Sequence, residues 1–158
     1  MKKATVVQGG PPVSGWSRFV VELLVEDLDA SLAFWCDALG FQIAYRRVSQ
    51  GFVYLERVED GAKLMLSTRV AQQGRNETAA LEPPFGRGVM FQLDVEGLDS
   101  MVDAALRAGG AVHEPIHEEW RWVGNEDRES GRREAKILDP NGYLVMLAEN
   151  IGERHASR

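Results

Sequence analysis

The chain repeats itself, and this internal duplication limits the folds open to it more than any other feature. A shift of 70 positions aligns Val25-Glu26-Asp27-Leu28-Asp29 with Val95-Glu96-Gly97-Leu98-Asp99, and it brings Ala38 onto Ala108 and Gly40 onto Gly110. A shift of 81 positions aligns residues 61–66 with residues 142–147. Because the second shift is larger, we expect a longer loop in the second half. A duplicated chain of this kind is expected to fold as two copies of one supersecondary unit.

Each half predicts a strand, a helix and then three more strands. The apolar, β-branched runs 19–25 and 89–95 have the composition and length of strands. A helix capped by Asp27 or Asp29 follows the first run and ends at Gly40, and a second helix spans 98–108 before Gly109-Gly110. Further strands are expected at 41–48, 51–57 and 62–67, and at 111–117, 132–138 and 143–149. The sequence therefore predicts an α+β fold built from two βαβββ modules.

The length of 158 residues is that of a single domain, and 44% hydrophobic with 27% charged residues is typical of a globular protein. We expect an N-terminal arm at 1–18, modules at 19–67 and 89–149, a linker at 68–88 and a tail at 150–158. No run is long enough for a membrane span, and the N-terminus does not resemble a secretory signal, so we expect a cytoplasmic protein. Cys36 is the one cysteine and is expected to pack as a small hydrophobic residue.

Charge and motifs exclude several classes of function. The formal net charge of −6 argues against a nucleic-acid partner. No nucleophile–histidine–acid set is found, and Gly86-Arg87-Gly88 lacks the strand and helix that surround a phosphate-binding loop. A hydrolase and a nucleic-acid-binding protein are therefore not expected.

Several local motifs resemble the vicinal-oxygen-chelate superfamily, which includes glyoxalase I, extradiol dioxygenases, fosfomycin resistance enzymes and bleomycin resistance proteins. They are the segment 24–41 with its Phe34-Trp35 pair, the segment 120–131, which looks like a tryptophan loop, and the Asp139-Pro-Asn-Gly-Tyr143 turn. The resemblance covers about residues 19–150, and within the superfamily the chain resembles the bleomycin-resistance branch in particular. It implies modules that form half-barrel cups, the glyoxalase/bleomycin resistance fold. It also implies a homodimer, because the family pairs modules across chains, and the arm would then lie across the partner or form a disordered leader.

The resemblance also locates the positions where metalloenzymes of this superfamily place one metal ligand on each of four strands. These positions are Val20, Met65, Met90 and Met146, none of which offers an oxygen or nitrogen ligand. Thioethers could hold Cu(I), but methionine more often fills adaptable apolar pockets. We therefore expect no metal, no cofactor and no catalytic residues.

Strand alternation predicts which side chains line the cups instead. Residues with the same parity as the four vacated positions point into the cup, whereas the opposite face, with Phe19, Val21, Leu23 and Val25, packs under a helix. Aromatic rings are expected to stack on a planar ligand, and carboxylates are expected to bind its cationic tail. The alternatives are that the rings pack in the core and that the carboxylates only reach solvent. The predicted ligand-binding residues are Glu22, Phe52, Tyr54, Met65, Met90, Gln92, Asp94, Trp120, Trp122 and Met146.

These features predict a small-molecule binding protein that sequesters a planar, cationic, toxic compound of the bleomycin type and so confers antibiotic resistance. One alternative is an enzyme of the superfamily, such as a glyoxalase, lyase or dioxygenase, with a non-standard site. Another is a protein that senses or binds a small metabolite. Stoichiometric metal in the purified protein would favour the enzyme.

Overall fold

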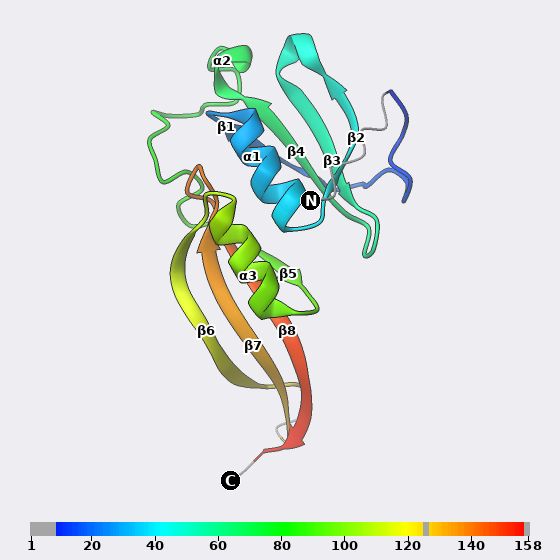
Figure 1. Ribbon diagram of the computed structural model, residues 1–158, viewed down its shortest axis with the longest axis vertical. Helices are drawn as coiled ribbons and strands as arrows, with labels where there is room; N and C mark the ends of the chain where they lie inside the picture. Colours follow the sequence, from blue (N-terminus) through cyan, green and yellow to red (C-terminus); the bar gives the residue numbers. More distant parts are fainter. Residues whose placement is uncertain (1–8, 125–126, 157–158) are drawn as a thin grey trace. The chain divides into compact units, whose positions relative to one another are not determined.

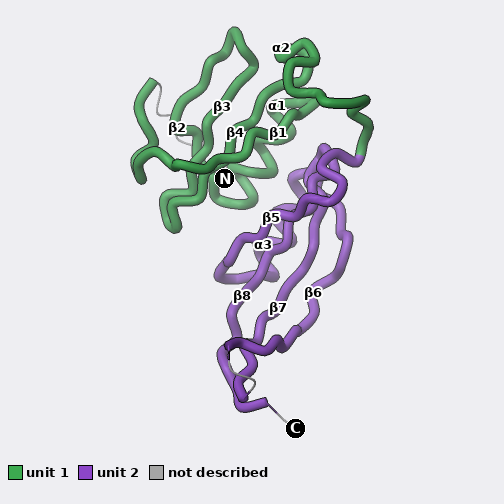
Figure 2. The backbone as a smooth tube through the Cα atoms, turned by 180° about the vertical axis from the view of Figure 1, so that it is seen from behind, with its two compact units in different colours: residues 1–83 green, residues 84–158 purple. Residues whose placement is uncertain are grey.

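The computed structural model describes residues 9–124 and 127–156. The chain forms two compact units, residues 1–83 and 84–158, which are coloured separately in Figure 2. Each unit contains one strand, a covering helical segment and three further strands, in that order, and the first unit has two additional short helical segments after its second and fourth strands. The predicted pair of βαβββ modules and the α+β class are therefore confirmed.

The first unit is built on a four-stranded sheet of order β1-β4-β3-β2 (Figure 1). Its strands are β1 (Val21–Val25), β2 (Gln42–Arg47), β3 (Phe52–Arg57) and β4 (Ala62–Thr68). Strand β1 runs parallel to β4, and the other neighbours are antiparallel. The helix after β1 starts as α1 (Leu28–Leu32) and continues as the π-helix η1 (Ala33–Ala38). Two short segments, η2 (Val48–Gln50) and α2 (Arg69–Gln72), follow β2 and β4.

The second unit repeats this topology, with sheet order β5-β8-β7-β6. Its elements are β5 (Met90–Asp94), α3 (Leu98–Arg107), β6 (Ala111–Trp122), β7 (Arg128–Leu138) and β8 (Leu144–His155). In the first sheet Glu22 is paired with Met65, and in the second Gln92 is paired with Met146. Gln92 follows Glu22 by 70 positions and Met146 follows Met65 by 81 positions, which are the two sequence shifts. The strand register therefore confirms that the modules are duplicates.

Each sheet packs one face under its own helical segment. The buried apolar side chains follow strand alternation, with Leu23, Val25 and Leu66 in the first unit, and Ile137 and Leu147 in the second. Trp35 is 1% exposed, which places it in the core. Phe19 was expected on this face but is 82% exposed, because it precedes the first residue of β1 and is not held by the pleat.

The helix ends are satisfied in different ways in the two units. The Asp27 side chain accepts a hydrogen bond from the Ala30 N–H at 3.0 Å, which selects Asp27 over Asp29 as the cap. Gly97 takes the cap position of α3 and has no side chain for this purpose. The carboxylate of Glu149 on β8 accepts the Gly97 and Leu98 N–H groups instead, at 2.7 and 3.3 Å. Burial, with a contribution from Asp37, raises the pKa of the Cys36 thiol to about 12, which matches its expected role as a packed, unreactive side chain.

The longer loop predicted in the second half is instead a pair of longer strands. Strand β6 continues to Trp122, β7 begins at Arg128, and β8 extends to His155, beyond the Glu149 end predicted from the sequence. Alternating arginines and glutamates pair across the extension, including Arg154 with Glu129 at 2.7 Å. These cross-strand charges support the extended pairing without an apolar core, so hydrophobic patterning did not reveal it.

Among the described residues, no helix is both long and apolar enough to cross a membrane.

The turn at Gly142 gives a test of the second unit. Gly142 has a φ of +89°, and a Cβ atom built there would lie 2.5 Å from Pro84 Cα. Gly109 has nearly the same φ of +91°, but its Cβ would meet nothing closer than Pro140 Cγ at 3.6 Å. We expect Gly109→Ala to lower the free energy of unfolding by about 1–2 kcal/mol through backbone strain alone. Gly142→Ala should lower it by a further 1–3 kcal/mol, roughly, because of the backbone clash. Equal losses in urea denaturation would contradict this assignment.

Candidate functional site

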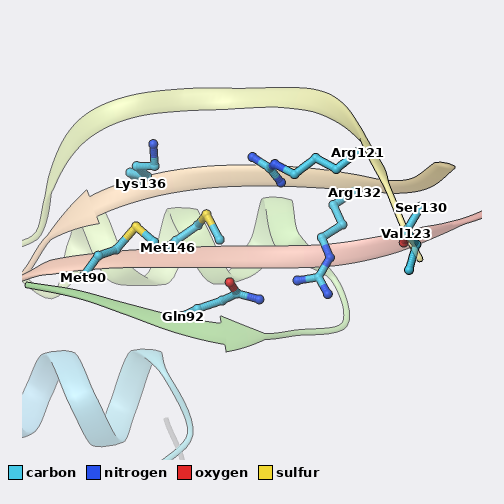
Figure 3. A pocket seen from close by; sticks show the side chains of 8 residues that line it. All are labelled: Met90, Gln92, Arg121, Val123, Ser130, Arg132, Lys136 and Met146. Atoms are coloured by element: carbon cyan, nitrogen blue, oxygen red, sulfur yellow. The ribbon is translucent and has the colours of Figure 1, made fainter. Parts of the chain in front are cut away.

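The sheet face that the helix leaves uncovered, here called the cup face, contains a cavity of about 500 Å³ in the second unit. Helix α3 lies behind this sheet in Figure 3, and the labelled side chains stand on the opposite side. The predicted ligand residues Met90, Gln92 and Met146 are brought together here. The full lining is Met90, Gln92, Arg121, Val123, Ser130, Arg132, Lys136 and Met146.

An ion pair between a half-exposed arginine and a buried glutamate contributes to this cup. Arg121 on β6 donates two hydrogen bonds to the Glu134 carboxylate on β7, at 2.9 and 2.7 Å. Glu134 is 1% exposed, while the Arg121 side chain is half exposed and lines the cavity. The hydrogen bonds from Arg121 lower the pKa of Glu134 although burial acts to raise it, so the carboxylate is charged at neutral pH. His117 Nε2 lies 3.6 Å from the same carboxylate.

Two further cations line the cavity, each with a carboxylate at its side. Arg132 lies 3.1 Å from Asp94, and Lys136 lies 2.9 Å from Glu114. Asp94 was predicted to face a cationic ligand, but its carboxylate accepts hydrogen bonds from Arg132 and, at 3.2 Å, from Gln92. Its side chain is 74% exposed, at the rim of the cavity.

The two predicted stacking tryptophans, Trp120 and Trp122, do not line this cavity. Because Arg121 points into the cup, strand alternation turns its two neighbours to the other face of the sheet. The Trp120 ring packs there against Gly131, where an added Cβ would lie 2.6 Å from the ring, and the Arg154 guanidinium lies over it at 4.0 Å. Trp122 is exposed.

The cup face of the first unit holds a cluster of aromatic side chains. Phe52 and Tyr54 are buried, and Val20, Tyr45 and Met65 pack against them. Tyr45 stacks on Tyr54, with ring centroids 5.3 Å apart. The structure thus brings together three of the predicted ligand residues, Phe52, Tyr54 and Met65.

Residues 13–17, here called the strap, lie on this aromatic cluster. The N–H groups of Val13 and Ser14 donate to the Glu56 carboxylate at 2.8 and 3.1 Å, and the Ser14 hydroxyl donates at 2.7 Å. The Trp16 ring makes edge contacts with Tyr45 and Tyr54 at 5.9 and 5.6 Å. The described part of the arm therefore packs on its own chain, whereas a partner chain or disorder was expected; residues 1–8 lie outside the described residues.

Glu22, the remaining predicted ligand residue of the first unit, lines a separate polar cavity of about 380 Å³ together with Arg47 and Phe52. Its carboxylate accepts a hydrogen bond from the Ser67 hydroxyl. The Arg47 guanidinium lies 4.7 Å from the Phe52 ring centroid, so this ring already makes a cation–π contact.

The side chains of the cup faces do not fit the divalent metal site of the superfamily's enzymes. Met90 and Met146 contribute thioethers to the second cup, and Val20 and Met65 contribute apolar atoms to the first. Across residues 9–124 and 127–156, no three His, Cys, Asp or Glu side chains gather closely enough to hold a metal ion. A hard or borderline divalent ion needs several such ligands at one point.

The cations of the second cup and the strap of the first were not predicted from the sequence. Arg121 was placed in a loop, so its alternation with Trp120 and Trp122 was not used; extending the strand to Trp122 would have placed it in the cup. Arg132 and Lys136 share the parity of Glu134 on β7 and could have been found in the same way. No local signal indicated that Glu56 binds the strap, since that contact spans more than 40 positions.

Comparison with known proteins gives consistent matches to one superfamily. The family model described as the Glyoxalase/Bleomycin resistance protein/Dioxygenase superfamily matches residues 19–147. Hypothetical protein SA1046 from S. aureus is similar with a TM-score of 0.59 and 25% identity, covering 86% of this chain and 96% of that one. A glyoxalase-related enzyme from Fulvimarina pelagi has a TM-score of 0.60 and 16% identity, and the match covers 87% of this chain and 95% of that one. TioX from Micromonospora sp. ML1 has a TM-score of 0.58 and 18% identity, and the match covers 86% of this chain and 100% of that one. No curated protein sequence matches the chain significantly.

The strap gives a pH-dependent prediction. Burial acts to raise the pKa of Glu56, but the hydrogen bonds from Ser14 and Val13 lower it below its ordinary value. We expect Glu56→Gln to lower the free energy of unfolding by about 1–3 kcal/mol at pH 7, where the lost bonds are charge-assisted. A carboxyl group whose pKa is lowered in the folded state stabilises the fold at pH values above its ordinary pKa of about 4.3. This contribution is lost as the pH falls through the lowered pKa. The difference between wild type and variant should therefore shrink by pH 3 in urea denaturation.

Hydrogen exchange identifies the segment involved. The amides of Val13 and Ser14 should lose protection in Glu56→Gln at pH 7, whereas Glu22→Gln, a change on the same cup face without a strap contact, should leave them protected. Unchanged protection of both amides in Glu56→Gln would contradict the strap assignment.

Proposed function

Because this chain belongs to the glyoxalase/bleomycin resistance protein/dioxygenase superfamily, we propose that it uses the cup faces of that fold to bind and sequester a small organic compound without a metal ion. The observation that carries the proposal is the lining of the second cup. Its side chains are two thioethers, a valine, an amide, a hydroxyl and three cations. Such a lining offers apolar contact and hydrogen-bond donors, which suit an organic ligand and do not suit a divalent metal ion.

A bleomycin-type compound is the first ligand that we propose, with antibiotic resistance as the consequence. The first unit supplies the features expected for a planar cationic molecule. Phe52 and the carboxylate of Glu22 line one cavity of the first unit, where they would contact a flat ring and a cationic group. In the second unit, the cations of the cup would separately donate hydrogen bonds to acceptor groups of a compound of this type.

The test is a calorimetric titration of EDTA-treated protein with bleomycin. We expect saturable binding, a compound that mass spectrometry finds unchanged, and a melting temperature unaffected by the chelator. Met90→Trp should weaken binding about tenfold or more, because Met90 lines the cup and the larger ring fills it. Leu106→Trp, on the outer side of α3, is the matched control and should bind as wild type does. Conversion of the compound, or a bound divalent metal whose removal lowers the melting temperature, would overturn the proposal.

We also propose that the working unit is a homodimer. The outer strands are β1 and β2 in the first sheet and β5 and β6 in the second. Each outer strand has one edge that is not hydrogen-bonded to another strand of its sheet. Such edges favour association with another chain unless they are covered. We expect light scattering at micromolar concentration to give twice the mass of one chain. A monomeric mass across that concentration range would contradict the dimer.

A further inference from the structure

The second unit contains an apolar cavity of about 410 Å³ next to the cup, which no expectation from the sequence had identified. Phe85, Val89, Leu138 and Leu144 supply most of its side-chain wall, with His113 and Arg87 at its polar part. Met90 lines both this cavity and the cup. The two cavities are thus neighbours on one unit.

The strand register makes the two cavities consecutive along the sheet. Leu138 is paired with Leu144 in the apolar cavity, and two residues along, Lys136 is paired with Met146 in the cup. At about 3.3 Å per residue, this step is roughly 7 Å. In Figure 3 the two methionines lie toward one end of the cup, and the guanidinium groups of Arg121 and Arg132 lie further along the strands. The apolar cavity therefore lies at one end of the combined surface and the two guanidinium groups lie toward the other, with Lys136 beside the methionines.

The charged side chains that line this surface are cationic, while Asp94 and Glu114 pair with Arg132 and Lys136 from outside the lining. Its lining includes Arg87, Arg121, Arg132 and Lys136, and neither described lining includes an aspartate or a glutamate. Glu134, which binds Arg121, is 1% exposed and lies beneath the guanidinium, so a ligand in the cup meets the cation first. Arg121 uses two N–H donors for Glu134, and a guanidinium has five.

We propose that this surface binds an amphiphilic organic anion, with its apolar body in the Phe85–Leu144 cavity and its carboxylate, sulfonate or phosphate among the cations of the cup. Two oxygens of such a group can pair with two guanidinium donors, and Met90 and Met146 provide an adaptable apolar passage between the two ends. The inference rests on the proposed function, since it names the ligand chemistry of the second cup.

The test compares decanoate with decylammonium, which share one alkyl chain and differ in the sign of the head group. Both are titrated calorimetrically into the EDTA-treated full-length protein, below the concentrations at which they form micelles. We expect saturable binding of decanoate that raises the melting temperature, and at least tenfold weaker binding of decylammonium. Tighter binding of decylammonium, or binding of decanoate that does not saturate, would overturn the inference.

Variants separate the two ends of the surface. Arg132→Gln and Lys136→Gln should each weaken decanoate binding about five- to tenfold and reduce its dependence on salt, because the lost interaction is electrostatic. Val89→Asp places a carboxylate at the apolar cavity on a half-exposed position and should weaken binding at least tenfold. Arg128→Gln, an exposed arginine outside both linings, is the control and should leave the affinity unchanged. Undiminished affinity in Arg132→Gln and Lys136→Gln together would also overturn the inference.

The proposed function and this inference fail in different ways. Bleomycin binding by metal-free protein without decanoate binding would leave the proposed function standing and remove the inference. Bound divalent metal together with conversion of a substrate would remove the proposed function, whatever the affinity for decanoate.

Discussion

One constraint organises each unit: a four-stranded sheet has two faces, and each module supplies one helical segment to cover one of them. Strand alternation therefore sends apolar side chains such as Leu66 and Ile137 under the helix and leaves the other face to polar and aromatic residues. The uncovered face cannot be an ordinary core, because the module has no second layer to place on it. In each unit this face contains residues at the positions where the superfamily's metalloenzymes place their metal ligands, including Met65 and Met146.

Much of this arrangement could be predicted because it depends on local periodicity. The two sequence shifts relate the observed pair Glu22–Met65 to the pair Gln92–Met146, and parity predicted that Met90, Gln92 and Met146 share a surface. A two-residue period fixes the face of a side chain once the strand is recognised. The element order and the helix cap, which the sequence limited to Asp27 or Asp29, follow from signals within a few residues of each other.

The failures have a different physical origin, since they involve contacts between distant parts of the chain or strands stabilised by charge. Ion pairs such as Arg154–Glu129 support the extended pairing of β7 with β8, which hydrophobic patterning cannot detect. Because β6 was ended before Trp122, Trp120 was assigned to the ligand site and Arg121 was left in a loop. The strap depends on Glu56, whose donors lie more than 40 residues away. A carboxylate in a strand has no sequence feature that predicts which distant N–H groups will reach it.

Glu56 and Glu134 explain why the two cups differ. Each is a carboxylate buried on an uncovered sheet face, at 1% exposure, and a buried charge must be hydrogen-bonded or paired. Glu56 is satisfied chiefly by N–H and O–H groups of the strap, which lies over the aromatic cluster and brings Trp16 onto it. Glu134 is satisfied by Arg121 from the adjacent strand, so no additional segment is needed above the sheet. The source of the donors thus decides whether a cup is covered or open, and Arg121 is the residue that leaves the second cup accessible to a ligand.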